Sequence, residues 1–388
     1  MDIAIEVLRA IGRLFMNPLL YIALFSLVLL GYVRVKRERK YFKIRILGGW
    51  TELRLGINSL LAGLVISIFT VGLGMALPLQ FLLVVMLLSV LFVVLQLQKL
   101  LSPVIVFALS FLLLIGMQLA GDEFSLFGVD VFGERYDTPV VTAFTIIAGM
   151  LVIVEGLKMK KHGAQLGSPI LERTRRGGRA VAYLSKGLWI VPVFIVIPGD
   201  VIPVMEPYFP RLALGDDMYS LLVFPFVVGF KQLTRTNIPS QVYATYSKAV
   251  LVLGQITIIG GIASYFDALV GVITLLVCAV LRIVIALVVM SEQRKGVYAV
   301  VAKPYGTMIA AVLPNSPAEK MGLLPGEVIK RVNGQEVLNE RELYEALQIN
   351  AALCKLEVLD YENELRLTQH VVHSEDHHRI GVLLAETK

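Results

Sequence analysis

Histidine side chains near the C-terminus are the first candidates for chemistry in this sequence. Four of the five histidines stand close together, and imidazole nitrogens at such spacing could ligate a transition metal. No cysteine lies near enough to help close a site, so a hydrated connecting loop explains the cluster better. We therefore expect no metal ion and no cofactor. The four residues are His370, His373, His377 and His378.

Catalytic motifs are the second feature to look for, and the sequence lacks them. An intramembrane metalloprotease needs His-Glu-x-x-His on a membrane span, whereas the remaining histidine, His162, stands alone. A Gly-x-Ser-x-Gly elbow, a phosphate-binding loop and a dinucleotide fingerprint are also missing. The sequence predicts a protein that is not an enzyme.

Three charged residues lie in otherwise apolar segments, where a charge is a candidate for transport or proton-relay chemistry. They are Glu155, Lys186 and Arg282. Glu155 and Lys186 lie close enough to the ends of their segments to reach the membrane interface. Arg282 could pair with an acid such as Glu155 inside a helical bundle. Because no internal repeat of the kind found in transporters is visible, we favour a structural role.

The apolar content of the chain determines its broad class. Hydrophobic residues make up 56% of the 388 residues, charged residues make up 17%, and the mean hydropathy is +0.74. A soluble domain has roughly 45–50% apolar and about 25% charged residues, so a soluble fold is excluded. The two cysteines, Cys278 and Cys354, cannot form a disulfide framework.

Apolar segments long enough to cross a bilayer recur before residue 291 and predict a polytopic α-helical bundle of about eight or nine spans. Four prolines interrupt the region of the sixth and seventh segments, which could be kinked or re-entrant. The prolines are Pro192, Pro198, Pro203 and Pro225. The segments are Pro18–Val33, Gly56–Leu77, Leu79–Leu97, Pro103–Ala120, Val140–Leu157, Val181–Pro198, Tyr219–Phe230, Ala249–Phe266 and Ala268–Met290.

Loop charges predict which side of the membrane each segment faces, because clustered Lys and Arg stay in the cytoplasm. The clusters within 34–45 and 158–179 are basic, whereas the loops 122–137 and 200–217 are acidic. The last span ends at Arg294 and Lys295, which predicts a cytoplasmic tail and an N-terminus outside. Since the positive charge serves insertion, we expect no nucleic-acid partner. The first apolar run precedes a basic cluster, which favours a retained anchor over a cleaved leader.

Three regions follow from these patterns. Residues 1–16 have an amphipathic helical pattern and predict an arm along the membrane interface. Residues 17–291 form the transmembrane domain, and residues 296–388 form a small α+β domain in the cytoplasm. In that tail, Ser316-Pro317 begins a helix, Gly322 ends it, and Asn333-Gly334 makes a hairpin turn.

The tail closely resembles bacterial PDZ domains over roughly the last quarter of the chain. The resemblance implies that a partner peptide adds as a strand in a groove between a sheet edge and a helix. It rests on the runs Pro314-Asn315-Ser316-Pro317-Ala318-Glu319-Lys320-Met321-Gly322-Leu323, Pro325-Gly326-Glu327-Val328-Ile329 and Val332-Asn333-Gly334-Gln335-Glu336-Val337.

By position, this resemblance places the groove's loop at Pro304, Tyr305, Gly306 and Thr307, its strand at Met308, Ile309 and Ala310, and its helix wall at Glu340, Tyr344 and Leu347. Leu347 is equally compatible with core packing, whereas the two tyrosines favour exposed positions. Thr307 departs from the hydrophobic-Gly-hydrophobic loop of the family. An internal strand of a partner is therefore as good a candidate ligand as a free C-terminus.

The layout of the whole chain resembles the MinJ family of cell-division topological determinants of rod-shaped Gram-positive bacteria. The shared features are many spans, a short N-terminal arm, the basic cluster Arg34–Arg45, Ser168-Pro169 leading into Arg173–Arg179, and one C-terminal PDZ domain. The resemblance implies a membrane scaffold at septum and poles that bridges DivIVA-like and MinD-like proteins.

Two other classes of function remain open from the sequence. One is a transport or secretion component with a regulatory PDZ domain, and the other is an accessory subunit of a membrane protease. Association of the chain with further copies of itself is also open. Cellular localisation separates these alternatives, because only the division scaffold is expected at septa.

Overall fold

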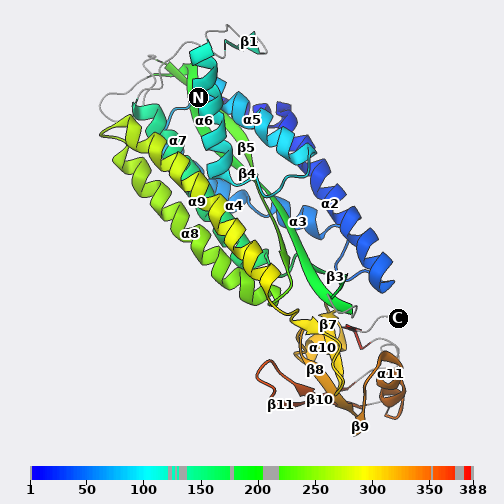
Figure 1. The fold of residues 1–388 in the computed structure, drawn as a ribbon. Coiled ribbons are helices and arrows are strands. Elements are labelled where there is room, and N and C mark those ends of the chain that lie inside the picture. The colour runs from blue at the N-terminus through cyan, green and yellow to red at the C-terminus, as the bar shows by residue number, and fades with distance from the viewer. Residues whose placement is uncertain are drawn as a thin grey trace.

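The computed structural model describes residues 2–120, 125–126, 129–130, 138–174, 179–203, 218–350, 353–371 and 380–385. Most of the two acidic loops expected on the outer side of the membrane is not among the described residues, and neither are His373, His377 and His378. Of the first loop, the structure describes a short ribbon of β1 (Ser125–Leu126) and β2 (Val129–Asp130). Figure 1 shows an elongated helical domain and a smaller domain rich in strands at one end.

The helical domain contains five apolar helical stretches of membrane-crossing length among the described residues. Two further helices, α5 (Leu79–Val94) and α6 (Pro103–Ala120), are apolar but shorter. The long stretches are Pro18–Phe42, Thr51–Gly72, Thr138–His162, Pro239–Ala263 and Ala268–Lys295. The helices are α1 (Asp2–Met16), α2 (Pro18–Phe42), α3 (Thr51–Ile57), α4 (Leu60–Gly72), α5 (Leu79–Val94), α6 (Pro103–Ala120), α7 (Thr138–His162), α8 (Pro239–Ala263) and α9 (Ala268–Lys295).

The segments expected to be the sixth and seventh spans are β-strands, so the expectation of a purely α-helical bundle of eight or nine spans is corrected. They form β4 (Arg179–Pro203) and β5 (Met218–Thr234), a long antiparallel hairpin in which Pro192 lies opposite Pro225. Valine is frequent in both segments, isoleucine in β4 and phenylalanine in β5, and all three residue types favour strands. A buried strand and a membrane span show the same unbroken apolar run, so length and composition alone did not separate them.

The hairpin runs between two groups of helices, with α2 and α3 against β4 and α7 and α9 against β5 (Figure 1). A strand edge inside an apolar environment needs partners for its N–H and C=O groups. On the β4 edge, Ser67 Oγ accepts the N–H of Phe194 at 2.9 Å, and Thr70 Oγ1 donates to the Phe194 carbonyl at 2.6 Å. The N–H of Leu77 donates to the Val196 carbonyl at 2.9 Å. Helix α4 and the turn after it therefore cover this edge.

The opposite edge of the hairpin is covered by α1. The carboxylate of Glu6 accepts the N–H of Leu221 at 3.2 Å, and Arg13 Nη1 donates to the Leu221 carbonyl at 2.6 Å. Arg13 also pairs with Glu6 at 2.7 Å, and the Glu6 side chain is fully buried. The amphipathic helix α1 thus packs against the outer edge of β5.

Replacing Ser67 with alanine tests the covering of the β4 edge. The N–H of Phe194 would lose its acceptor in an apolar setting, which costs about 1–3 kcal/mol of unfolding free energy. Ser110→Ala is the matched control, because the buried Ser110 hydroxyl donates only to the Val106 carbonyl of its own helix. We expect thermal unfolding in detergent to be earlier for Ser67→Ala than for Ser110→Ala. Equal unfolding temperatures would contradict the edge assignment.

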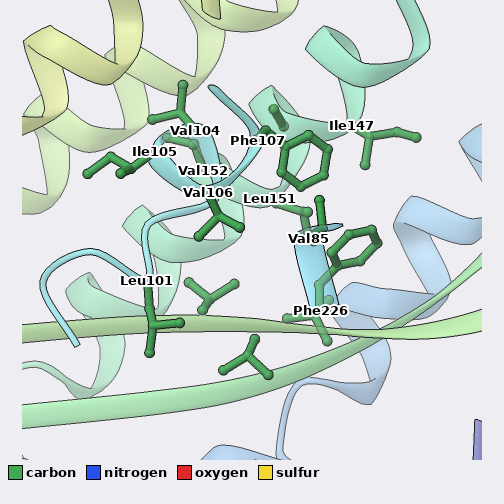
Figure 2. Close-up of a cluster of buried hydrophobic side chains, with 14 of the residues drawn as sticks. Val85, Leu101, Val104, Ile105, Val106, Phe107, Ile147, Leu151, Val152 and Phe226 are labelled. Carbon is green, nitrogen blue, oxygen red and sulfur yellow. The ribbon is translucent and has the colours of Figure 1, made fainter. Parts of the chain in front are cut away.

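The core of the helical domain lies where α5, α6 and α7 meet the hairpin. Figure 2 shows Phe107, Ile147 and Leu151 converging with Val85 and Phe226 in this region. The rings of Phe81 and Phe144 stack with their centroids 3.7 Å apart. Beside this core, α7 and α8 approach closely through glycines, since a Cβ at Gly149 would lie 3.1 Å from the Gly254 carbonyl oxygen. Small residues at such contacts are typical of helix pairs in membranes.

The smaller domain has the α+β composition expected of the tail. Its turns also match the sequence signals, because Ser316 caps α10, Asn339 caps α11, and Gly322, Asn333 and Gly334 have positive φ. The strands β11, β10, β8, β7 and β12 lie side by side in this order, with β9 paired to β8. The elements are β6 (Val300–Val301), β7 (Thr307–Val312), α10 (Pro317–Lys320), β8 (Val328–Val332), β9 (Gln335–Glu336), α11 (Glu340–Gln348), β10 (Leu353–Leu359), β11 (Leu365–Val371) and β12 (Val382–Leu384).

Candidate functional site

The strand predicted to receive a peptide, β7, is paired on both of its edges. Thr307 and Met308 lie opposite Ile329 and Val328 of β8, and Ile309 lies opposite Leu384 of β12. A further strand cannot add where two neighbours are already hydrogen-bonded. The sheet edge available for strand addition is therefore not the one expected from the sequence.

The side chains of the predicted loop and strand lie mostly inside the domain. Thr307, Met308 and Ile309 are buried, and the Met308 sulfur accepts the N–H of Val301 at 3.2 Å. A Cβ at Gly306 would collide with Val328 and lie 2.7 Å from the Ile329 carbonyl oxygen, so this glycine serves close packing. Tyr305 is 44% exposed and does not line the cavity described below.

The two edge strands of the sheet are β11 and β12, and the edge that faces α11 belongs to β12. This strand ends the order of the sheet, and among the described residues no strand pairs with its outer side. Gly381 O accepts the N–H of Leu313 at 2.8 Å, and Leu383 lies opposite Ala311. Because backbone groups alternate in direction along an antiparallel strand, the N–H and C=O of Val382 point away from β7.

A cavity of about 500 Å³ lies along this open edge. One wall is Gly381 together with Val382 and Leu383 of β12, and the facing helix α11 contributes Glu340 and Tyr344. A groove between a sheet edge and a helix is the arrangement used for strand addition. Of the residues predicted for the helix wall, Glu340 and Tyr344 line this groove, whereas Leu347 packs against the core of the domain.

The third wall of the groove comes from the helical domain. The end of α2 and the residues after it contribute Arg39, Phe42, Lys43, Ile44 and Arg45. We call this stretch the α2 wall. It belongs to the basic cluster Arg34–Arg45 that follows the first apolar segment. The groove therefore lies where the two domains meet.

A buried ion-pair network holds the residues that follow the α2 wall. Arg34 pairs with Glu52 and lies 3.0 Å from the carboxylate of Glu38. Its guanidinium also donates to the Gly48 carbonyl at 2.7 Å, and Glu38 accepts the N–H of Ile46 at 2.8 Å. Arg34 is thus a structural member of the basic cluster, whereas Arg39, Lys43 and Arg45 form no ion pair with any residue that the structure describes.

The two domains are also joined by strand pairing and hydrogen bonds. Val301 of β6 lies opposite Ala180 of β4, and the Tyr183 hydroxyl donates to the Ala310 carbonyl at 2.7 Å. The hairpin of the helical domain therefore continues into the PDZ-like domain. This junction fixes β7, and through it β12, relative to the α2 wall.

A polar triad strengthens the junction. The carboxylate of Glu172 on β3 (Gly167–Arg173) accepts from Arg235 Nε at 2.7 Å and from the Tyr298 hydroxyl at 2.7 Å. The hydrogen bonds from Arg235 hold the pKa of the Glu172 carboxyl below its ordinary value. Partial burial and the neighbouring carboxylate raise the pKa of the Tyr298 hydroxyl.

These pKa shifts predict that the junction between the two domains is stable only within a limited range of pH. A lowered carboxyl pKa contributes stability above the ordinary value of 4.5, and this contribution is lost as the pH falls through the folded pKa. A raised tyrosine pKa contributes stability that is lost as the pH rises above about 10. We expect spin labels at Lys160 and Lys330 to report a narrow distance distribution at neutral pH that broadens below pH 4.

Two variants separate this triad from general acid unfolding. Glu172→Gln should broaden the distances between the labels already at pH 7, because the charge-assisted bonds to Arg235 are lost. Glu336→Gln is the control, since Glu336 pairs with Arg331 inside the PDZ-like domain. Unchanged distances in Glu172→Gln at pH 7 would show that the triad does not hold the junction.

Two of the three charged residues in the apolar segments form a buried ion pair with each other. Arg282 donates to Glu155 from Nη2 at 2.5 Å and to the Tyr246 hydroxyl from Nη1 at 3.0 Å. The Ser102 hydroxyl donates to the other oxygen of Glu155 at 2.6 Å. The predicted pairing of Glu155 with Arg282 is confirmed. Lys186 lies on β4 and not in a helix.

The strand residues of the groove were missed in the sequence, although a signal was present. Ile380-Gly381-Val382 has the hydrophobic-Gly-hydrophobic pattern that the loop at Tyr305-Gly306-Thr307 lacks. These residues follow the domain's other elements in the chain, and only the pairing of β12 with β7 brings them to the groove.

Comparisons with known proteins identify the smaller domain and find relatives of the chain. The PDZ domain family matches residues 308–359, so the chain carries a PDZ domain. The chain is similar to the cell division topological determinant MinJ of Bacillus subtilis (strain 168), with 28% identity over 98% of this chain and 96% of that protein. It is also similar to a probable cell division topological determinant MinJ of Lacticaseibacillus paracasei, with 25% identity over 62% of this chain and 64% of that protein. The resemblance expected from the sequence is confirmed.

Proposed function

We propose that this protein is a non-enzymatic membrane scaffold that recruits division proteins through the groove between β12 and α11. The observation that carries the proposal is an open sheet edge beside a cavity of about 500 Å³, placed against the end of α2. A PDZ domain is a peptide-binding module, and the similarity to MinJ extends over 98% of this chain. Both support a binding role in division-site selection.

The scaffold is multi-pass, with the PDZ domain on the cytoplasmic side. The basic residues at the ends of α2, α7 and α9 support this orientation, since clustered Lys and Arg stay inside. A hairpin returns the chain to the side that it left, as two helices would. Replacing two spans by β4 and β5 therefore leaves the predicted side of every loop unchanged, with residues 1–16 outside and residues 296–388 inside.

The proposed partners are proteins of the DivIVA and MinD kinds, at septum and poles. Residues 17–291 would hold the groove close to the membrane on which such partners assemble. Confinement to one surface raises the effective concentration of both binding partners, so individually weak peptide contacts suffice. No nucleotide site is required for that role.

Deletion of the gene and imaging of a fluorescent fusion test the proposal. We expect the fusion to collect at septa and poles, and cells without the protein to misplace their septa. A fusion spread evenly around the cell, together with normal septum placement after deletion, would exclude the division role. Movement of a solute into liposomes by the purified protein would favour the transport alternative. Loss of a proteolytic activity after deletion, with septa in place, would favour the accessory subunit of a protease.

A further inference from the structure

Unpaired cations on the α2 wall distinguish this groove from one built by a PDZ domain alone. Arg39, Lys43 and Arg45 line the cavity and form no ion pair among the described residues. The single acid in the lining is Glu340 on α11, on the other side of the groove. The groove therefore carries a net positive charge, concentrated on one wall.

We propose that the groove accepts an extended peptide segment with acidic side chains, and that the α2 wall is an integral part of the binding site. This inference rests on the proposed function, because it names the ligand class of the same groove. The backbone of the segment pairs with the outward N–H and C=O of Val382. Side chains on one face of the added strand then point towards the α2 wall, since successive residues of a strand face opposite sides.

Charge complementarity makes this segment acidic. Carboxylates on the wall-facing side would pair with Arg39 and Arg45, and arginine binds carboxylates in a favourable two-pronged geometry. A basic segment would face three cations at short range, which disfavours it. The isolated domain from residue 296 to 388 lacks this wall, so it should retain strand addition and lose the acidic preference.

Binding of labelled peptides to the full chain in nanodiscs tests the inference. The probes share one alternating Val-Thr core and differ only in their flanking residues, which are three glutamates, three glutamines or three lysines. At low salt we expect the glutamate probe to bind at least tenfold more tightly than the glutamine probe, and the lysine probe to bind most weakly. The advantage should shrink as salt is added, because exposed charges are screened.

Two sets of variants locate the effect. The triple variant Arg39→Gln/Lys43→Gln/Arg45→Gln should reduce the affinity ratio between the glutamate and glutamine probes to less than threefold. The matched control is Lys40→Gln, because Lys40 is an exposed cation of the same helix that does not line the cavity. Equal affinities for the glutamate and glutamine probes, or an undiminished advantage in the triple variant, would overturn the inference.

The headgroup of an anionic lipid is the competing ligand for the same cations. Arg39 and Arg45 also line a hollow with the exposed aromatic residues Tyr32 and Trp50. Nanodiscs of zwitterionic lipid and nanodiscs with phosphatidylglycerol separate the two at constant salt. Glutamate-probe binding in both supports the peptide assignment, whereas its loss with phosphatidylglycerol would assign the cations to headgroups and overturn it.

Failure of this inference and failure of the division role are distinguishable. Equal binding of all three probes would reject the acidic preference but leave localisation at septa untouched. A fusion without septal enrichment would reject the division role, and a measured glutamate preference would still stand.

Discussion

Replacement of Arg282 with leucine should lower the unfolding temperature of the helical domain by about 10 °C, through a loss of about 3–5 kcal/mol. The carboxylate of Glu155 would remain fully buried and keep the hydrogen bond from the Ser102 hydroxyl at 2.6 Å, but it would have no opposite charge among the residues that the structure describes. A buried charge without its partner is among the most costly changes a protein can undergo. The effect should be large because Arg282 links three helices, through Glu155 on α7 and Tyr246 on α8.

The two cysteines make this measurement specific to one domain. Cys278 is buried in α9, one turn from Arg282, and Cys354 is buried in β10 of the PDZ domain. In a Cys354→Ala background, a thiol-reactive dye reports only the opening of the helical domain during heating. The expected result is earlier labelling of Cys278 in Arg282→Leu.

A double variant checks the physical reason. Arg282→Leu/Glu155→Leu removes both charges, and apolar replacement of a whole buried pair is often close to neutral. We expect it to recover most of the lost stability. A double variant that unfolds as early as Arg282→Leu would show that the lost packing, and not the unpaired charge, causes the defect.

Replacement of Gly381 with alanine should destabilise the PDZ domain by about 3 kcal/mol and free β12 from the sheet. Gly381 has a φ of +86°, and a Cβ there would collide with the side chain of Ser316. Ser316 caps α10, so it cannot withdraw without losing its bond to the Glu319 N–H at 3.3 Å. The strand must move instead, and β12 forms one side of the groove.

Gly334 supplies a matched control for this variant. It has the same φ of +86°, but a Cβ there meets no atom within 4 Å. Gly334→Ala therefore measures backbone strain alone, about 1 kcal/mol. In a Cys278→Ala background the dye reports Cys354, and we expect Gly381→Ala to unfold well before Gly334→Ala. Equal unfolding temperatures would contradict the close packing of β12 against α10.

Features that depend on residues close together in the chain were predicted correctly, whereas the pairing of distant strands was not. The turns of the PDZ domain were correct because they depend on neighbours in the chain, as at Ser316, Asn339 and Asn333-Gly334. The pairing of Glu155 with Arg282 was also correct, since a charge in an apolar bundle needs an opposite charge and few were available.

The errors concern strand pairing, which the sequence encodes only indirectly. Segments 181–198 and 219–230 have the apolar length of spans, and the polar groups that satisfy their strand edges come from Glu6, Arg13, Ser67 and Thr70, far away in the chain. The groove strand was misplaced for a related reason. Local patterns identify β7 as a strand but do not reveal that β12 occupies its outer edge.

The central claim is that the groove between β12 and α11 is the binding surface of a division scaffold. A comparison of two tyrosine variants in cells tests this claim most directly. Tyr344 lines the groove, whereas Tyr305 is an exposed tyrosine of the same domain that does not. Each variant is expressed as a fluorescent fusion at native level, and protection of the buried Cys354 from a thiol-reactive dye confirms that the domain is folded. Tyr344→Ala should lose enrichment at septa and misplace division, while Tyr305→Ala should localise normally. Normal localisation of a folded Tyr344→Ala, or loss of enrichment in Tyr305→Ala alone, would contradict the assignment of the groove.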